Sequence, residues 1–471
     1  GAGKSWLATA LCRWIASRGL KVAPFKAQNM SNNARVVAGG EIGSAQYFQA
    51  LAAGVEPDVR MNPLLLKPES DTHSQVVLLG QVNEALSRLP WHERGERVWP
   101  VIAGALDALR AENDVVVIEG AGSPAEINLS ASDIVNLRVA RHGQARCLLV
   151  TDIDRGGAFA HLYGTWALLE ASERERIEGF VLNKFRGDRA LLAPGPQMLQ
   201  DLTGVPTVAT LPMWREHGLP DEDGVFDDRG RGSGEVRKTI AVIAYPRVSN
   251  LDEFQPLKHL AGVRLVWART PADIAGADWV VLPGSKHTSA DLRALRSQGL
   301  DAAVERHAAH GGAVLGICGG LQMLGEALID PQAIEGNGPG LGLLPLVTVF
   351  EPSKVVRRAA ARFEAVAGPW SALSGVAMQG YEIHQGRTVQ HPAMAAARPV
   401  LARCLGWQSG EGRVLGLYLH GLFEDPDVLQ ALFGAGVPTL DSVFEGLSDC
   451  IAREFPPSFL EDLVRVPAGR P

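Results

Sequence analysis

The string Gly316-Ile-Cys318-Gly-Gly320 has the residue types of a nucleophile held in a tight turn. An apolar run, Ala313–Ile317, predicts a strand that ends at the cysteine, and a second apolar stretch from Leu321 predicts a helix after it. Such a turn exposes the nucleophile at the sheet edge and directs the helix N-terminus at the thiol, which favours the thiolate. A free cysteine is usually a buried structural residue, but the flanking glycines, which permit a strained backbone, favour a catalytic role.

A thiolate nucleophile needs a base and an oxyanion hole. His420 follows the apolar run Val414–Leu419, so we expect it at the carboxyl edge of a strand and predict it as the base. His384 is the alternative candidate for this base. Most of the 12 histidines are expected to be structural. Gly284 ends another predicted strand, and the backbone N–H groups there and at Gly319 are predicted to form the oxyanion hole.

A second set of residues has the chemistry of phosphate binding. Gly3-Lys4-Ser5 opens a helical pattern and matches the end of the loop G-x-x-x-x-G-K-[ST], which would place Lys4 on phosphate and Ser5 on Mg²⁺. The first glycine of that loop would lie before residue 1, so we expect a strand and half a loop, roughly ten residues, to precede Gly1. Such a short string also occurs by chance, but Glu119 follows the buried run Val115–Ile118, where a second metal ligand belongs.

The run Phe180–Asn183 predicts another strand, and Asn183 and Lys184 lie at its end. The amide can recognise the edge of a purine while the lysine stem packs on the base. The alternative is an ordinary turn asparagine.

Short apolar runs alternate with helical patterns, which predicts parallel βαβ units in doubly wound α/β sheets that bind ligands at the carboxyl ends of their strands. The polar, glycine-rich stretch 223–238 interrupts the alternation and is predicted to be a linker. We therefore expect a first α/β domain, with the phosphate-binding residues, at 1–222, a second α/β domain, with the cysteine, at 239–455 and a loosely held tail at 456–471. The expected strands of the two domains are Val22–Phe25, Val115–Ile118, Cys147–Thr151 and Phe180–Asn183, then Thr239–Ala244, Trp279–Leu282, Ala313–Ile317 and Val414–Leu419.

Composition excludes several classes of protein. The 471 residues carry a net charge of −7 without a basic tract, so nucleic acid is not an expected partner. No apolar run reaches the roughly 18 residues of a membrane span, and the first residues do not form a signal peptide. The five cysteines are scattered without paired spacing, which is typical of a reducing cytoplasm.

Longer strings resemble the cobyric acid synthases, amidotransferases of cobalamin biosynthesis with a P-loop, dethiobiotin-synthetase-like domain and a class I glutaminase domain. The resemblance runs almost from end to end. It is carried by Ala23-Pro-Phe-Lys-Ala-Gln-Asn-Met30, Glu56-Pro-Asp-Val-Arg-Met-Asn-Pro63, Leu66-Lys-Pro68 with Ser70-Asp71, Glu119-Gly-Ala-Gly-Ser-Pro-Ala-Glu-Ile-Asn-Leu129, Asp152-Ile-Asp-Arg-Gly-Gly157, Asn183-Lys-Phe-Arg-Gly-Asp188, Leu282-Pro-Gly-Ser-Lys286, Gly316-Ile-Cys-Gly-Gly320 and Gly380-Tyr-Glu-Ile-His384.

The resemblance implies that glutamine is hydrolysed at Cys318 with His420 and that ammonia passes to the first domain. There ATP and Mg²⁺ would activate the b, d, e and g carboxylates of adenosylcobyrinic acid a,c-diamide as acyl phosphates, which ammonia converts to amides. The implied partners are small-molecule substrates, glutamine or ammonia and the corrinoid a,c-diamide, and the oligomeric state stays open. The implied site residues are Gly284, Gly319 and Gln322 for the oxyanion and glutamine; Gly3, Lys4, Ser5, Lys26, Asn183 and Lys184 for ATP; and Ser5, Glu119 and Asp71 for the metal.

One position departs from the wider class. Class I glutaminases typically carry a glutamate two residues after the catalytic histidine, where this chain has Leu422. The cobyric acid synthases resemble this dyad arrangement, so the residue that orients His420 stays open, with Glu424 and Glu382 as candidates.

Two other functions compete with this interpretation. A cobyrinic acid a,c-diamide synthase would have the same two domains and different target carboxylates, but the string Phe25-Lys-Ala-Gln-Asn29 argues against it. A ParA-like regulatory protein with an inactive glutaminase domain belongs to another class, and the intact pair of Cys318 and His420 argues against that.

Overall fold

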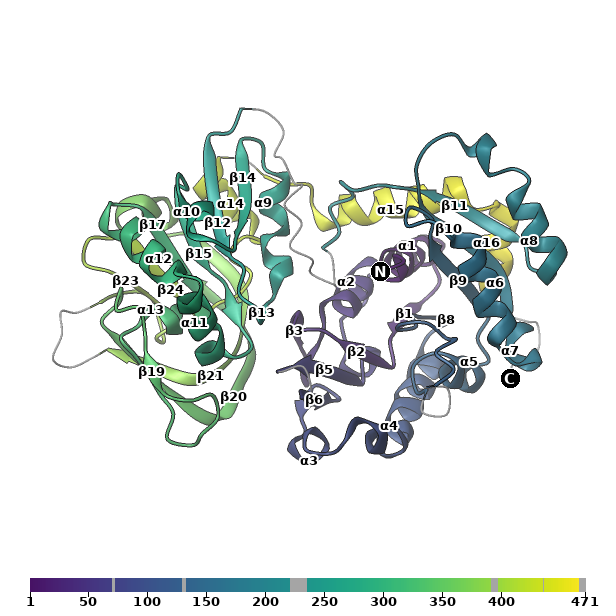
Figure 1. The fold of residues 1–471 in the computed structure, drawn as a ribbon, viewed down its shortest axis with the longest axis horizontal. Helices are drawn as coiled ribbons and strands as arrows, with labels where there is room; N and C mark the ends of the chain where they lie inside the picture. The colour runs from purple at the N-terminus through teal and green to yellow at the C-terminus, as the bar shows by residue number, and fades with distance from the viewer. Residues whose placement is uncertain (70–72, 129–132, 221–234, 391–396, 435, 466–471) are drawn as a thin grey trace.

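Two α/β units lie side by side in the computed structural model, which describes residues 1–69, 73–128, 133–220, 235–390, 397–434 and 436–465 (Figure 1). The first unit contains the N-terminal residues and the second begins at β12. Both units are built around parallel strands formed by apolar runs, as the sequence predicts.

The parallel strands of the first unit form two separate sheets. In one, β1 pairs with β8, and in the other the order is β11-β10-β9. The edges of β8 and β9 that face each other are not paired, and a cavity lies between these two strands. The bounds are β1 Val22–Phe25, β8 Val115–Ile118, β9 Cys147–Asp152, β10 Ile177–Phe185 and β11 Thr207–Pro212.

Helices and two smaller sheets complete the first unit. The larger of these sheets has the strand order β2-β5-β6-β7, and β3 pairs with β4. The bounds are α1 Lys4–Ala16, β2 Gln28–Met30, β3 Ala34–Val37, β4 Gly40–Gly43, α2 Ser44–Ala52, η1 Val59–Met61, β5 Leu64–Pro68, β6 Ser74–Leu78, β7 Gln81–Val82, α3 Glu84–Ser87, α4 Trp91–Glu112, α5 Leu137–Gly143, α6 Ala158–Leu168, α7 Ala171–Arg174, η3 Arg189–Leu192 and α8 Gly195–Thr203.

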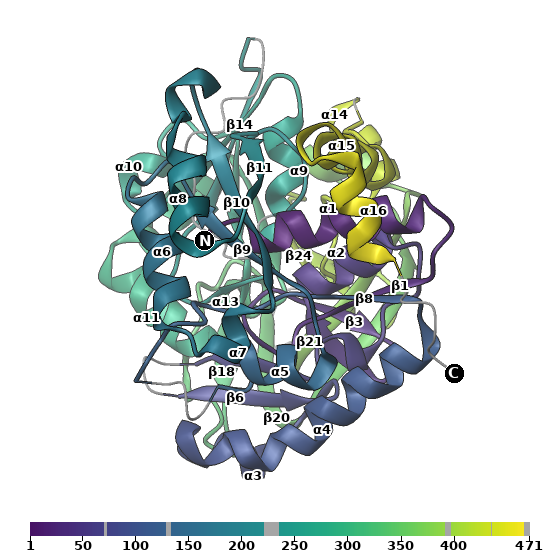
Figure 2. The same ribbon diagram turned by 90° about the vertical axis from the view of Figure 1, so that its right-hand side faces the viewer.

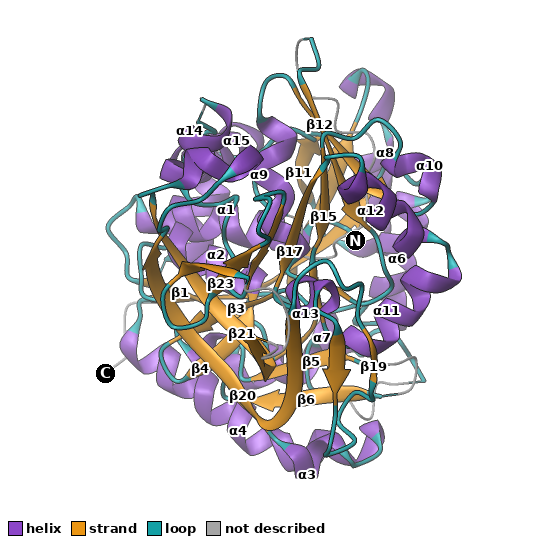
Figure 3. Cartoon of the chain, turned by 90° about the vertical axis from the view of Figure 1, so that its left-hand side faces the viewer, coloured by secondary structure: helices purple, strands orange, loops and turns teal. Residues whose placement is uncertain are grey.

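A seven-stranded sheet forms the centre of the second unit, with the order β14-β12-β15-β17-β24-β23-β22; its strands β12, β15 and β17 can be followed in Figure 3. Its first five strands are parallel, and β23 and β22 are antiparallel additions at one edge. The bounds are β12 Lys238–Ile243, β14 Val263–Ala268, β15 Trp279–Leu282, β17 Ala313–Ile317, β22 Arg398–Leu401, β23 Gly406–Gln408 and β24 Val414–Leu417.

A second, four-stranded sheet of this unit has the order β19-β18-β20-β21, and its long strands β20 and β21 contact β3 of the first unit. The remaining bounds are β13 Val248–Ser249, η4 Leu251–Phe254, α9 Gln255–His259, α10 Pro271–Ile274, β16 Gly284–Ser285, α11 Thr288–Ser297, α12 Leu300–Ala309, α13 Gly319–Leu324, β18 Ala327–Ile329, β19 Gly338–Pro339, β20 Leu346–Arg362, η5 Gly368–Leu373, β21 Ala377–Gln390 and α14 Pro426–Phe433.

The last two helices, α15 (Leu440–Glu454) and α16 (Pro457–Val464), pack on the first unit (Figure 2). We had expected residues up to 455 to belong to the glutaminase domain and the rest to form a loose tail. Instead, Phe444 of α15 and Leu460 of α16 are buried in the same apolar cluster as Leu7 of α1. The apolar spacing of the helices could not show which domain they cover. The expected linker lies mostly outside the described residues, and Lys238 already begins β12.

Candidate active sites

Cys318 lies in a strained turn between β17 and α13, as the string of glycines predicts. Its φ of 52° and ψ of −107° are unusual for a residue with a side chain. A Cβ at Gly320 would lie 1.9 Å from the carbonyl oxygen of Leu282, and one at Gly316 would lie 2.7 Å from the backbone nitrogen of Leu321. Only glycine therefore fits at these two positions, because the end of β15 lies against Gly320 and the start of α13 lies against Gly316.

His420 is fully buried, and its imidazole is fixed by a carboxylate. Its Nδ1 lies 3.1 Å from Oε1 of Glu253, and the second oxygen of that carboxylate accepts a hydrogen bond from the backbone N–H of Gly421, also at 3.1 Å. Both oxygens of Glu253 are thus engaged on the same short segment. A carboxylate on Nδ1 fixes the orientation of the ring and leaves Nε2 for the reaction.

The charge of His420 depends on its two acidic neighbours. Burial alone would lower the pKa of the imidazole, but its interactions with the Glu253 carboxylate and with Cys318 raise it to about 10. These two neighbours therefore favour the protonated form of the imidazole.

The two carboxylates that the sequence suggested for orienting His420 have other partners. Glu424 binds Arg35 of the first unit through both oxygens, at 2.5 and 2.6 Å. Glu382 pairs with Arg357 and lies 3.3 Å from Nε2 of His384. The sequence analysis did not single out Glu253 as the partner of His420, because Glu253 precedes His420 by 167 residues. Its position in the segment after β12 was the one sequence feature that could have indicated this role.

The other residues predicted for this site lie against the same catalytic turn. A Cβ at Gly284 would lie 2.7 Å from Cε1 of His420, so the absence of a side chain there makes room for the imidazole. A Cβ at Gly319 would lie 2.8 Å from the backbone nitrogen of Ser285, which brings the two predicted oxyanion-hole segments together. Gln322 is buried and lines the same cavity as Cys318.

Glu119 is the centre of a second polar cluster, at the carboxyl end of β8. Its Oε1 accepts hydrogen bonds from the Ser5 hydroxyl at 2.8 Å and from the Lys26 ammonium at 3.0 Å. Its Oε2 accepts from the side-chain amide of Gln49 at 2.6 Å. The structure thus brings Ser5, Lys26 and Glu119 together, and Gln49 is a polar neighbour that the sequence did not single out.

The start of α1 carries the remaining predicted nucleotide residues. Gly3, with a φ of 87°, precedes the helix, and a Cβ there would lie 2.1 Å from Nδ2 of Asn183. Lys4 points to the carbonyl oxygen of Gly122 at 3.4 Å, and Lys184 donates to the carbonyl oxygen of Gly1 at 2.8 Å. All these residues meet at one end of the first unit, whereas Asp71 lies outside the described residues.

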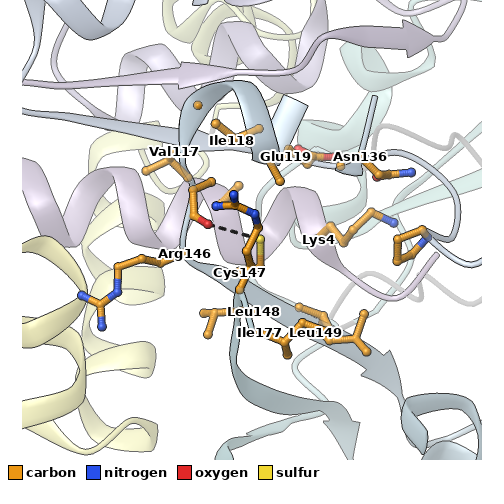
Figure 4. A pocket seen from close by; sticks show the side chains of 18 of the residues that line it. Lys4, Val117, Ile118, Glu119, Asn136, Arg146, Cys147, Leu148, Leu149 and Ile177 are labelled. Atoms are coloured by element: carbon orange, nitrogen blue, oxygen red, sulfur yellow. Dashed lines mark hydrogen bonds between the residues drawn. The ribbon is translucent and has the colours of Figure 1, made fainter. Parts of the chain in front are cut away.

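The cavity between β8 and β9 opens beside this cluster. Figure 4 shows Val117 and Ile118 of β8 on one side and Leu148 and Leu149 of β9 on the other, with Lys4 and Glu119 at one end. These strands are apolar but only half-buried, which is unusual for parallel strands.

No group of three or more His, Cys, Asp or Glu side chains in the described ranges is arranged to hold a metal ion. None of the helices in that part of the chain is long and apolar enough to cross a membrane.

A cysteine–histidine–glutamate site in one α/β unit and a lysine–serine–glutamate cluster in another define a two-domain glutamine amidotransferase with a nucleotide-binding domain. The comparisons agree with this class. The CobQ/CobB/MinD/ParA nucleotide binding domain family matches residues 1–217, and the CobB/CobQ-like glutamine amidotransferase domain family matches residues 239–428.

Similar proteins cover almost the whole chain. A cobyric acid synthase of Variovorax paradoxus is 72% identical over 98% of this chain and 97% of its own length. One of Acidovorax ebreus is also 72% identical, with the same coverage, and one of Leptothrix cholodnii is 66% identical over 97% of this chain and 93% of its own. The chain belongs to the cobyric acid synthase family.

Proposed function

We propose that the chain is an ATP- and glutamine-dependent ligase that converts adenosylcobyrinic acid a,c-diamide to adenosylcobyric acid by amidating its b, d, e and g carboxylates. The observation that most supports this is the presence, in a member of this family, of both a buried Cys318–His420–Glu253 group and the Glu119 cluster at the start of α1. One site releases ammonia and the other activates its acceptor.

Glutamine hydrolysis follows from the geometry around Cys318. The thiolate attacks the side-chain amide carbon, and the backbone N–H groups near Gly319 and Ser285 stabilise the oxyanion. The His420 imidazolium gives its proton to the leaving nitrogen, which departs as ammonia and leaves a thioester. Water, activated by the now neutral imidazole, hydrolyses the thioester to glutamate and restores the thiol.

The first unit makes the acceptor reactive. A carboxylate of the corrinoid attacks the γ-phosphorus of ATP, ADP leaves, and an acyl phosphate forms. Ammonia then attacks the acyl carbon and displaces inorganic phosphate, which completes the amide. Lys4 and Lys26 hold the phosphate oxygens, and Asn183 and Lys184 contact the nucleotide.

The residues around Glu119 fit a magnesium ion. The Ser5 hydroxyl and the Glu119 carboxylate are oxygen ligands held 2.8 Å apart, and Mg²⁺ in such sites needs only one or two protein oxygens besides phosphates and water. Ser5 and Glu119 would hold the ion, which neutralises phosphate charge when bound. We place the enzyme in the cytoplasm because its five cysteines form no disulfide.

The decisive experiment supplies ATP, Mg²⁺, the a,c-diamide corrinoid and glutamine labelled with ¹⁵N in its side-chain amide. We expect products with up to four labelled amides, counted by mass spectrometry. Cys318→Ser should lose this incorporation and keep it with labelled ammonium salt, because the thiolate serves only ammonia release. A folded variant that loses both activities would contradict the two-site mechanism, and wild-type protein that hydrolyses glutamine without amidating the corrinoid would refute the proposed substrate.

A further inference from the structure

Three lysines line the cavity that contains Cys318. Lys286 follows β16 and Lys354 belongs to β20, both in the second unit, whereas Lys67 belongs to β5 of the first unit. Asn32 of the first unit lines the same cavity. The walls around the nucleophile are therefore supplied by both units.

Two lysines of this cavity share one carboxylate, whereas the third, Lys286, pairs with Glu69 at 3.0 Å. Lys67 and Lys354 both donate to Glu41, one to each carboxylate oxygen, at 2.6 and 2.5 Å. The side chains of Glu41, Lys67 and Lys354 are only 1%, 4% and 13% exposed. Among the described residues, this buried group combines two ammonium groups with one carboxylate, so it has an excess positive charge beside the cavity.

The pKa values reflect that imbalance. Burial raises the pKa of Glu41, but Lys354 and Lys67 outweigh it and lower the value to about 2. Burial lowers the pKa of Lys354 to about 8; Glu41 opposes this shift and the nearby Lys67 adds to it. An anion in the cavity would relieve the repulsion between the two ammonium groups.

A carboxylate of the same cavity supplies the opposite charge. Glu335 is buried, with Oε2 at 3.4 Å from the backbone nitrogen of Ser289 and 3.7 Å from Nδ1 of His287. Burial raises the pKa of Glu335 to about 7, which an adjacent ammonium would lower again. A cavity lined by two ammonium groups that share one carboxylate, and by a further buried carboxylate, suits a zwitterion better than a simple anion.

We propose that Lys67 and Lys354 bind the α-carboxylate of glutamine, with Glu335 on its α-ammonium, so that the first unit contributes directly to the glutamine site. This rests on the proposed glutaminase function. The side-chain amide then reaches Cys318 while the charged end of the substrate is held at the contact between the units. Glutamine binds tightly only where Lys67 of the first unit is in place.

The test compares glutamine with two analogues that lack one charged group each. Lys67→Met leaves Glu41 paired with Lys354, so the fold keeps a balanced ion pair. We expect kcat/KM for glutamine to fall about 10- to 100-fold, the effect of losing one charge-assisted hydrogen bond. With 4-aminobutanamide, which lacks the α-carboxylate, wild-type and variant should react equally slowly. With glutaramic acid, which lacks only the α-ammonium, the variant should remain impaired.

Controls separate substrate binding from docking of the units. Arg358 of β20 also crosses to the first unit, where its Nε donates to the carbonyl oxygen of Val36 at 3.2 Å, but it is not part of the cavity wall. Arg358→Met should therefore keep the wild-type KM for glutamine, and Lys354→Met should repeat the pattern of Lys67→Met. Amidation with ammonium salt reports the folding of each variant.

Two outcomes would overturn the proposal. One is an unchanged KM for glutamine in both lysine variants, and the other is an equal loss of activity towards glutamine and 4-aminobutanamide, which would assign the lysines to docking alone. Wild-type protein without any glutaminase activity would instead refute the proposed function.

Discussion

Replacing Glu253 by glutamine is expected to shift the pH dependence of glutamine hydrolysis. The carboxylate lies 3.1 Å from Nδ1 of His420 and raises the pKa of the imidazole, which reaches about 10 with the help of Cys318. An opposite charge at such a distance typically contributes 1–3 pKa units, or about 1.4–4 kcal/mol of imidazolium stabilisation. In Glu253→Gln the imidazolium should therefore be lost at a pH about 1–3 units lower.

Hydrogen bonding adds to this electrostatic effect. In the wild-type protein both oxygens of Glu253 accept, one from the protonated imidazole and one from the backbone of Gly421. A glutamine has only one acceptor oxygen, so its NH₂ group must face one of these donors. We expect kcat to fall as well, because the ring loses part of its orientation.

The assay is kcat/KM for glutamine hydrolysis from pH 6 to about 10.5, with the alkaline limb as the readout. Glu253→Asp keeps the charge and should shift this limb less than Glu253→Gln does. Glu382→Gln is a matched control, since Glu382 is also a buried carboxylate beside a histidine, His384, but does not contact His420. An alkaline limb in Glu253→Gln that coincides with the wild-type limb would refute the role of Glu253.

Protein stability should change in the same pH window. The folded pKa of His420 lies above its ordinary value of 6.5, so the group stabilises the fold fully below about pH 6.5, and the contribution is lost as pH rises through about 10. Denaturant unfolding of Glu253→Gln should show a weaker decline of stability across that window.

The remaining predictions concern the first unit. Glu119→Gln should block amidation with either glutamine or ammonium salt, because an amide is a poorer ligand for a hard cation and has no second oxygen to accept from Gln49 while the first accepts from Ser5 and Lys26; ammonia-dependent activity at the wild-type level would remove Glu119 from the metal site. A chain extended at Gly1 by an apolar strand of about six residues and a glycine-rich loop should fill the cavity between β8 and β9 and bind an ATP analogue with Mg²⁺ more tightly than the 471-residue chain. Calorimetric titration of both forms decides, and equal affinities would show that Gly3, Lys4 and Ser5 suffice.

Local sequence was enough to predict the elements that carry the chemistry. The apolar runs before Cys318, Glu119 and Asn183 are buried or half-buried parallel strands, because strands covered on both faces need apolar residues throughout. The glycines beside Cys318 likewise indicated that another segment passes close to the turn, and Leu282 of β15 lies against Gly320. These signals lie within a few residues of the feature that they predict.

Contacts between distant segments were not predictable from such signals. Glu253 and His420 meet only because β12 and β24 end at the same edge of one sheet, and the sequence between them does not encode that neighbourhood locally. The packing of α15 on α1 is similar: an amphipathic helix shows that it has a partner, but not which one.

The residues that support His420 extend across the contact between the units. The segment that carries Glu253 is held by the first unit, where Asn33 accepts a hydrogen bond from the backbone of Leu251 at 3.0 Å. Beside it, Arg35 of β3 pairs with Asp252 at 2.5 Å and with Glu424.

Burial lowers the pKa of the Arg35 guanidinium, but Asp252 and Glu424 raise it well above its ordinary value. A buried network of this kind adds little net stability, since desolvation offsets most of the attraction, and removal of one partner leaves uncompensated charge. Its main effect is on geometry: without Arg35, the carboxylates Asp252, Glu253 and Glu424 would repel one another next to His420. The arrangement that holds the imidazole is thus complete only where the two units are docked.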